Sequence, residues 1–259
     1  MITVISPAKN LDYETTAPIS AYSQPELLSY SEELISVCRD LSVQDLAKLM
    51  KLSDKLSALN VARFASWSLP FTSDNAKQAI YAFNGDTYTG FDAYSASKET
   101  MDYAQNHLRI LSGLYGALKP MDLMQPYRLE MGTSLSNPKG NSLYAFWGSV
   151  IAEKLNEALA ESQSSVLVNL ASNEYFKAVD KKALNATVIT PIFKDEKNGQ
   201  FKVISFYAKK ARGMMARYIM EQQITQQEQL KQFNVAGYYF SEAETKKANE
   251  PVFLRHEQA

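Results

Sequence analysis

Ile2-Thr3-Val4-Ile5-Ser6-Pro7-Ala8-Lys9 opens the chain with a short apolar run that stops at a proline. Such a run predicts a buried strand, because proline cannot donate to a sheet ladder. Two later runs have the same form: Leu108 to Leu111 enters Ser112-Gly113-Leu114-Tyr115-Gly116, and Val166 to Leu170 enters Ala171-Ser172-Asn173-Glu174. If the three strands are neighbours in a parallel sheet, their carboxyl ends line one crevice, where α/β proteins usually bind ligands.

The rest of the chain alternates helical and extended patterns around these three strands. Apolar periodicity, serine caps and prolines predict helices over residues 25–40, 42–50, 53–66, 97–107, 143–160 and 209–222. Extended patterns predict strands at 80–83 and 238–240, and a hairpin of 187–193 and 201–207 around an Asn-Gly turn. No repeat or linker divides the chain. We therefore expect a mixed α/β (α+β) fold, with one domain over residues 1–259 and a mixed sheet flanked by helices.

Composition restricts the class of protein. The net charge is −1 and the pI near 6.2, so the whole molecule has no charge that demands a nucleic acid or a membrane. Cys38 is the only cysteine, so no internal disulfide forms, which indicates a reducing compartment. No apolar run reaches the roughly 18 residues of a membrane span, and the start lacks a basic leader. We expect a cytoplasmic protein without a membrane partner.

The charge is unevenly distributed along the chain. Residues 177–217 hold ten basic residues against three acidic ones, a local net charge of +7, whereas residues 12–45 hold seven acidic residues. A concentration of positive charge suits phosphate binding, because each neutralised phosphate releases condensed counterions. Four of the basic residues crowd the start of one predicted helix, where the helix dipole disfavours them, so we expect an anion there. They are Lys209, Lys210, Arg212 and Arg217.

The two helices predicted over residues 42–66 offer a second phosphate site. Lys48, Lys51, Lys55 and Arg63 carry their positive charge, and Asp54 is the single acid between 46 and 66. Two helices joined by a tight turn can direct backbone amides at a phosphate, as helix-hairpin-helix modules do without reading sequence. The turn Leu52-Ser53-Asp54-Lys55-Leu56 has no glycine, however, so a plain helical hairpin is the alternative.

The crevice at the strand ends supports a competing interpretation, an enzyme acting on a nucleotide or a damaged base. Lys9, Tyr115, Arg128, Glu130, Glu174 and Tyr175 would converge there as a pocket, with the two glutamates as acid and base. The usual catalytic signatures are missing from the sequence. Two histidines and one cysteine make no zinc set, and there is no phosphate loop, dinucleotide fingerprint or nucleophile elbow. We therefore favour a binding protein over an enzyme.

Several longer strings resemble the YaaA family of bacterial peroxide-stress proteins. Beside the opening Ile5-Ser6-Pro7-Ala8-Lys9 they are Asn84-Gly85-Asp86-Thr87-Tyr88-Thr89-Gly90, Leu108 to Gly116, Gln125-Pro126-Tyr127-Arg128-Leu129-Glu130-Met131-Gly132, Asn169 to Lys177 and Ile204 to Gly213. They run in order from residue 1 to about residue 255. Strings of this length are very specific, and we identify the chain as a member of that family.

The resemblance implies a cytoplasmic protein that protects against hydrogen peroxide and is linked to DNA repair. It implies one domain of unusual topology, with a helix-hairpin-helix and a basic cleft, that binds double-stranded or branched DNA without a cofactor or metal. It brings no catalytic residues and no obligate protein partner. The DNA-binding residues expected from charge and resemblance together are Lys48, Lys51, Ser53, Lys55, Arg63, Lys177, Lys209, Lys210, Arg212 and Arg217. An adaptor whose basic face binds an acidic protein is a third hypothesis.

Overall fold

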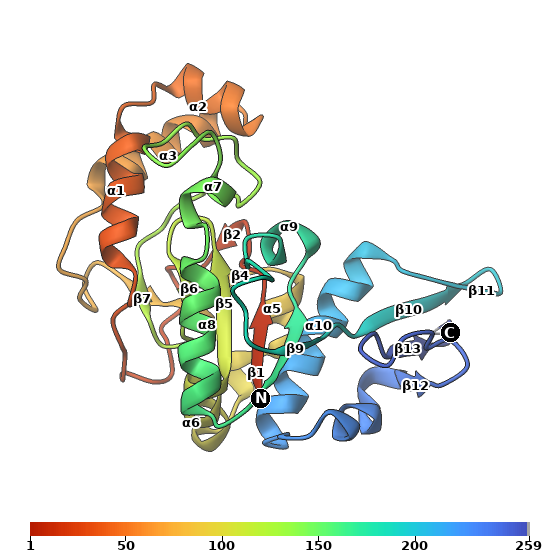
Figure 1. The fold of residues 1–259 in the computed structure, drawn as a ribbon. Helices are drawn as coiled ribbons and strands as arrows, with labels where there is room; N and C mark the ends of the chain where they lie inside the picture. The colour runs from red at the N-terminus through yellow and green to blue at the C-terminus, as the bar shows by residue number, and fades with distance from the viewer. Residues whose placement is uncertain (258–259) are drawn as a thin grey trace.

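The computed structural model describes residues 1–257, and its centre is a five-stranded sheet (Figure 1). The strand order is β6 (Gly116–Leu118), β5 (Leu108–Ser112), β1 (Ile2–Ile5), β8 (Val166–Leu170) and β9 (Thr187–Ile189). β1 pairs in parallel with both β5 and β8, and β8 pairs in parallel with β9, whereas β6 is antiparallel to β5. The three strands predicted as parallel neighbours are therefore neighbours, with β1 in the middle.

Helices cover both faces of this sheet. α8 (Val150–Glu161) packs on β1 and β6 from one side, and α10 (Ser205–Glu221) packs on β1 and β8 from the other (Figure 1). Two further helices, α5 (Asp86–Phe91) and α6 (Lys98–His107), lie against α10. All four residues of β1 are buried between the two helical layers, so β1 lies at the centre of the core.

A second, four-stranded sheet stands beside the first in the order β11 (Gln200–Lys202), β10 (Ile192–Lys197), β13 (Val252–Arg255) and β12 (Tyr239–Ser241). It is mixed, since β13 is parallel to β10 and antiparallel to β12. α10 contacts β10 as well as the first sheet, and one hydrophobic cluster contains residues of both sheets. The fold is the mixed α/β arrangement that the sequence predicts.

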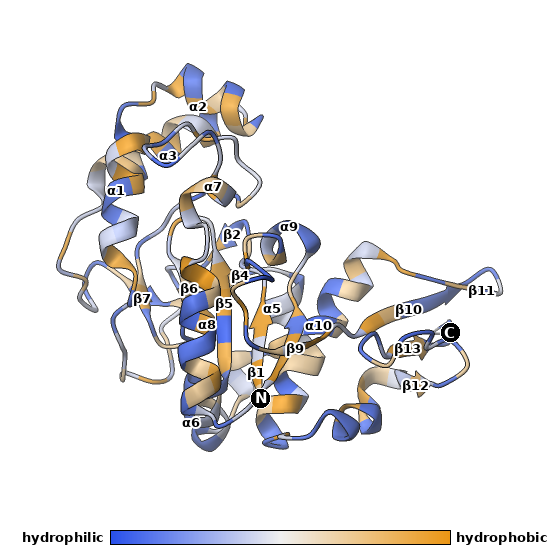
Figure 2. Cartoon of the chain, viewed as in Figure 1, coloured by the Kyte–Doolittle hydropathy of each residue, from blue (hydrophilic) through white to orange (hydrophobic). Residues whose placement is uncertain are grey.

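The remaining elements are short or lie at the periphery. They are α1 (Leu28–Arg39), α2 (Val43–Met50), α3 (Asp54–Ser66), α4 (Ala79–Ala82), α7 (Leu143–Trp147), α9 (Asn173–Phe176), the pair β2 (Asn10–Leu11) and β4 (Phe83–Asn84), the pair β3 (Lys77–Gln78) and β7 (Leu123–Met124), and short 3₁₀ turns. Figure 2 shows hydrophobic residues concentrated on the central strands and hydrophilic ones on α9. No helix within residues 1–257 combines the length and hydropathy needed to cross a membrane.

Two predicted elements are wrong in type or continuity. Residues 80–83 are not a strand: Ala79 to Ala82 form one helical turn, and only Phe83 is extended. All four residues of that turn are buried, and a short, fully apolar run does not distinguish a strand from a buried helix. The helix predicted over 143–160 is two helices, because Gly148 has φ +47° between α7 and α8.

The hairpin and the basic helix begin at different residues from those expected. Residues 187–189 pair with the first sheet, so the hairpin consists only of β10 and β11, with Asn198 and Gly199 at positive φ in the turn. α10 starts at Ser205, four residues before Lys209. The basic residues therefore lie from the second turn of α10 onward, and the helix start is not where their charge is concentrated. The strand β13 was not predicted.

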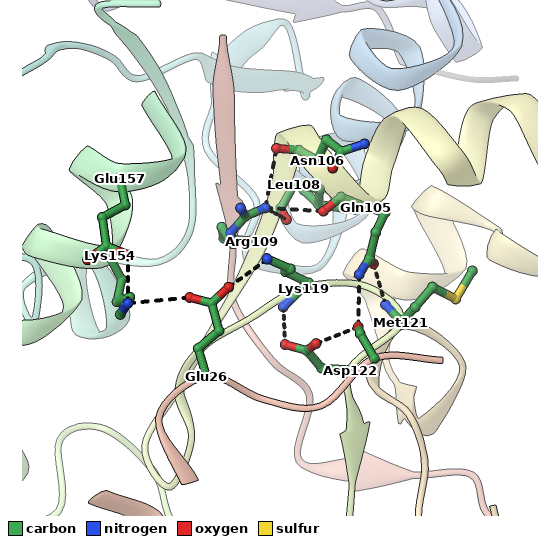
Figure 3. Close-up of polar contacts among 11 residues, drawn as sticks. Glu26, Gln105, Asn106, Leu108, Arg109, Lys119, Met121, Asp122, Lys154 and Glu157 are labelled. Carbon is green, nitrogen blue, oxygen red and sulfur yellow. Dashed lines mark hydrogen bonds and ion pairs between the residues drawn. The ribbon is translucent and has the colours of Figure 1, made fainter. Parts of the chain in front are cut away.

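A polar cluster surrounds Arg109, the second residue of β5 (Figure 3). The Arg109 guanidinium is buried and donates to the carbonyl oxygens of Gln105, Asn106 and Leu108. Asp122 is buried beside it, and its carboxylate accepts from Ser23 Oγ at 2.6 Å and from the Lys119 amide at 2.7 Å. Desolvation by burial nevertheless raises the pKa of Asp122 to about 6.

Candidate functional site

A cavity of about 400 Å³ opens at the carboxyl ends of β1 and β8. Because the two strands pair in parallel, Ser6 and Ser172 follow them side by side, and the Ser172 amide donates to Ser6 Oγ at 2.8 Å. Residues from five separate segments line the cavity. They are Ser6, Pro7, Ala8, Lys9, Asn10, Asn84, Gly85, Asp86, Thr87, Tyr88, Glu130, Leu170, Ser172, Glu174, Tyr175, Lys209 and Arg212. The predicted crevice is thus present.

The third strand end, after β5, does not open into this cavity. Gly113 packs so closely under the backbone of Leu129 that a Cβ there would overlap its carbonyl oxygen. The segment that carries Leu129 therefore covers the turn after β5. Tyr115 is fully buried beneath this segment, and its hydroxyl accepts from Trp67 Nε1 at 3.0 Å. The prediction that Tyr115 contributes to the pocket is wrong for this reason.

Glu130 is held by two cations at the edge of the cavity. Lys9 Nζ lies 3.2 Å from its carboxylate, and the Arg128 guanidinium donates to the same oxygen at 3.0 Å and 3.3 Å. Arg128 lines a small adjoining space and not the main cavity. Lys9, Arg128 and Glu130 thus converge as predicted, but they form a closed ionic group in which much of the charge is already compensated.

Glu174 enters the cavity from the first turn of α9. The Ser172 side chain caps this short helix, and the Gly132 amide donates to Glu174 Oε1 at 2.9 Å. The side chain is therefore anchored through one oxygen, and within residues 1–257 no cation forms an ion pair with it. Asp86, in the first turn of α5, is a third carboxylate at the cavity.

Lys209 and Arg212 line the cavity from α10 and provide positive charge there. They lie three residues apart on α10, so they share one side of the helix. Burial lowers the pKa of the Arg212 guanidinium, and no charged neighbour offsets that desolvation. In the part of the chain that the structure describes, neither Lys209 nor Arg212 has a carboxylate partner. Two uncompensated cations therefore face an open space, which is the arrangement that an anionic ligand would stabilise.

Close backbone packing places these two cations beside α5. A Cβ at Gly213 would overlap the Thr87 carbonyl oxygen, and a Cβ at Gly90 would overlap the Lys210 carbonyl oxygen. Glycine at both positions lets the backbones of α5 and α10 touch. As a result, Arg212 of α10 and Asp86 of α5 line the same cavity.

The helix pair α2–α3 forms as the sequence predicts. Ser42 and Asp45 make a reciprocal capping box at the start of α2, and Lys51 ends that helix at φ +54°. Ser53 caps α3 by accepting from the Leu56 amide, so its hydroxyl is already used. Lys48, Lys51 and Lys55 are exposed.

Arg63 of α3 is turned toward the cavity side of the molecule. It is half-buried, it donates to Asn60 Oδ1 at 3.4 Å, and burial together with the like charge of Arg128 lowers the pKa of its guanidinium. The positive charges of α3 and of the Glu130 group therefore lie close to each other.

Other basic residues of the 177–217 segment have individual environments that differ. The contacts of Arg217 lie within the fold: it pairs with Glu221 at 2.7 Å and donates to the carbonyl oxygens of Phe91 and Asp92. Lys194 pairs with Glu244 in the second sheet. Two further basic residues of this segment have no carboxylate partner among the described residues. Lys177 is exposed, with Nζ 4.9 Å from the centre of the Tyr144 ring, and Lys210 is half-buried on α10.

Some cavity residues were not assigned a role from the sequence. Asn84, Gly85, Asp86, Thr87 and Tyr88 form one wall, although the string that contains them was used only as a family signature. Asn10 and Ser172 were also not assigned a role, whereas Tyr175, which was expected at the pocket, does line it. The available signal was the strand end itself, since Ser6 directly follows β1 and Ser172 comes two residues after the end of β8. Within residues 1–257, no three His, Cys, Asp or Glu side chains are grouped to hold a metal ion.

Comparison with known proteins finds one matching family model and relatives that are similar over the full length of the chain. A family model described as peroxide stress protein YaaA matches residues 1–244. A UPF0246 protein of Pseudoalteromonas translucida is 66% identical over 259 residues, covering 100% of both chains. UPF0246 proteins of Psychromonas ingrahamii (62% over 257 residues, 99% of this chain and 100% of the relative) and Shewanella loihica (59% over 259 residues, 100% of both) are similar throughout.

Proposed function

Because this chain belongs to the YaaA family of peroxide stress proteins and so has a role in the peroxide stress response, we propose that it acts there by binding DNA. The DNA would be double-stranded or branched, and it would be held through its phosphates without reading sequence. Peroxide and ferrous iron generate radicals that break DNA strands, so a protein that holds damaged duplex is useful under that stress.

One observation carries this proposal: Lys209 and Arg212 face the cavity with no carboxylate to neutralise them. Arg212 is half-buried without a partner, which is unfavourable for a cation, and a bound phosphate removes that cost. Lys209 is exposed and adds a second positive charge beside it. Lys9 and Arg128, whose charge Glu130 compensates only in part, and the neighbouring Arg63 extend the positive charge from α10 toward α3. A duplex lying along this line would contact both groups of cations at once.

The α2–α3 pair supplies a second set of contacts in this proposal. Lys48, Lys51 and Lys55 are exposed and unpaired among the described residues, and they flank the turn between the two helices. Asp54 lies at the start of α3, where it opposes a phosphate, so we assign the contacts to the lysine side chains and not to the helix amides. Lysines of this kind position a duplex without specifying its sequence.

The test compares a double variant with a charge-matched control. In Lys209→Ala/Arg212→Ala, affinity for all duplex sequences should fall alike, and the slope of log K against log salt should decrease by about 2, because two phosphate contacts are lost. The control Lys98→Ala/Lys231→Ala removes the same charge from residues paired with Asp102 and Glu228. Fluorescence anisotropy between roughly 50 and 200 mM salt measures both quantities. Equal behaviour of the two variants, or a salt-independent affinity, would contradict the proposal.

A second candidate function is an enzyme that acts on a nucleotide or a damaged base. It is favoured by the three carboxylates of the cavity, Asp86, Glu130 and Glu174, since paired carboxyl groups serve as acid and base. Glu174→Gln should then abolish product formation while DNA affinity stays close to that of the natural protein. Prolonged incubation with damaged, branched and gapped DNA and with nucleotides, analysed for products, decides this; no product in any reaction would remove the candidate.

A further inference from the structure

The size of the cavity excludes a duplex from its interior. Its volume of about 400 Å³ equals that of a cube about 7 Å on a side. The major groove of B-DNA alone is about 12 Å wide, so a duplex can lie only across the opening. The same volume is within the roughly 300–1,000 Å³ typical of sites for small molecules. The cavity is therefore of a size for one nucleotide and not for a base-paired helix.

The charges of the lining suit a single phosphate group. Lys209 and Arg212 form the only pair of uncompensated cations among the lining residues that the structure describes. Asp86 and Glu174, on the other walls, carry negative charge that would repel a second or third phosphate. This combination favours a nucleotide with one phosphate over a nucleoside triphosphate.

The other lining groups suit a base. The Asn10 and Asn84 side chains are exposed at the cavity and make no hydrogen bond within residues 1–257, so each offers amide donors and a carbonyl acceptor to a base edge. Tyr175 is partly exposed at the cavity and contributes aromatic surface, on which any base can stack, whereas Tyr88 is buried beneath it against Phe83.

An exposed aromatic side chain stands next to the cavity cations. Phe206 is 56% exposed in the first turn of α10, and Val203 just before the helix is 57% exposed. Phe206 and Lys209 are three residues apart and so share a side of the helix. Apolar side chains at DNA interfaces insert where a base has left the stack. Phe206 is placed to occupy such a gap while Lys209 holds the phosphate.

We propose that this cavity binds one nucleotide unit displaced from a strand of the bound DNA, with its phosphate on Lys209 and Arg212 and its base against Asn10, Asn84 and Tyr175. The inference rests on the proposed DNA binding and adds what the cavity recognises. A displaced nucleotide costs least where it is already unpaired, which gives the protein a preference for distorted DNA.

The experiment measures a ratio of affinities by anisotropy. One duplex is fully paired, and the other carries a single unpaired 2-aminopurine nucleotide at its centre. The natural protein should bind the second at least about tenfold more tightly, because unpairing is already complete, and the fluorescence of 2-aminopurine should change on binding. Asn84→Trp, which adds bulk at the cavity without altering charge, should bring the ratio close to 1. Ala160→Trp, exposed near the end of α8 and at the other end of the sheet, is the matched control and should keep the natural ratio.

Two further arms keep the outcomes distinct. Phe206→Ala removes an exposed side chain that the fold does not need, and it should lower the ratio even if Asn84→Trp does not fold. Free deoxynucleoside monophosphates, tested by calorimetry against the triphosphates, separate a nucleotide unit of DNA from a free nucleotide as the source of the ligand. A ratio near 1 for the natural protein, or a ratio unchanged in both variants, overturns the inference while leaving duplex binding in place. Absence of binding to any DNA, with monophosphates still bound, refutes the proposed function and keeps the cavity as a free-nucleotide site.

Discussion

At the scale of single residues, Asp122 is the carboxyl group whose environment is most clearly altered. Burial raises its pKa to about 6, against an ordinary value of 3.8, although Ser23 and the Lys119 amide donate to it. Between these two pH values the unfolded chain loses the proton and the folded protein keeps it. Ionisation therefore favours unfolding, and the stability contributed by the neutral carboxyl group is lost as the pH rises through 6.

Asp122→Asn tests this linkage, because asparagine keeps the size and cannot ionise. The difference between about 6 and 3.8 corresponds to about 3 kcal/mol. As the pH rises from 4 to 7, the free energy of unfolding of the natural protein should fall relative to that of Asp122→Asn by up to this amount. Urea titrations at several pH values measure it, and curves that stay parallel would show that Asp122 does not titrate in this range.

The candidate site was predictable from the sequence only in part, for reasons that individual residues make clear. Lys9 and Glu174 follow strands, so their place at the crevice follows from parallel pairing. Tyr115 follows a strand as well, but a distant segment covers it, and no local pattern reveals that. Lys209 and Arg212 were identifiable as cations, whereas the absence of neighbouring carboxylates is a property of the folded chain.

At the scale of elements, the contact between α5 and α10 depends on glycine. An alanine at Gly213 would bring its methyl group into the Thr87 carbonyl oxygen, and one of the two helices would have to move. We expect Gly213→Ala to cost about 1–3 kcal/mol, or more if the helices cannot shift, and to lower Tm by roughly 2–4 °C per kcal/mol in a protein of this size.

Gly199→Ala is the control for this substitution. Nothing lies within 4 Å of a Cβ at Gly199, and its φ of +73° makes the cost purely conformational, about 1–2 kcal/mol. Calorimetric Tm values of both variants give the comparison. A smaller loss at Gly213 than at Gly199 would mean that the contact between the helices is not tight.

Elements with their own local signals were predicted well, and elements defined by their surroundings were not. Ser42, Ser53 and Ser97 each cap the helix that the sequence assigned to them, because a cap is a local hydrogen bond. The turn at Ala79–Ala82 has no such signal and is helical only because its surroundings bury it on all sides. The start of α10 was placed too late, since Phe206 and Tyr207 match a strand pattern equally well.

At the scale of the whole molecule, the two sheets share α10 and one hydrophobic cluster, so we expect them to unfold together. A buried group in the second sheet provides the test: Arg255 Nε donates to Asp195 at 2.6 Å, and Tyr238 donates to the same carboxylate at 2.9 Å. Arg255→Ala leaves this carboxylate without its cation, which typically costs about 3–5 kcal/mol.

Tryptophan fluorescence reports on unfolding of the first sheet, although the substitution lies in the second. Trp67 and Trp147 are both buried on the side of the first sheet, far along the chain from Arg255. In Arg255→Ala, their fluorescence transition should move to lower temperature together with the far-ultraviolet circular dichroism. Lys246→Ala, an exposed change in the same region, is the control. Two separate transitions, with the tryptophan signal unmoved, would show that the sheets are independent domains.

The glycine contact between α5 and α10 also determines how the cavity can adapt. Gly90 and Gly213 bring the backbones of α5 and α10 into direct contact. No side chain lies between them that a substitution could shorten, so the two helices cannot move closer together. Any change in the size of the cavity therefore has to come from residues 6–10 and 128–132, where side chains can be exchanged. Relatives that bind a larger ligand in this cavity should therefore differ at residues 6–10 and 128–132 and keep Gly90 and Gly213.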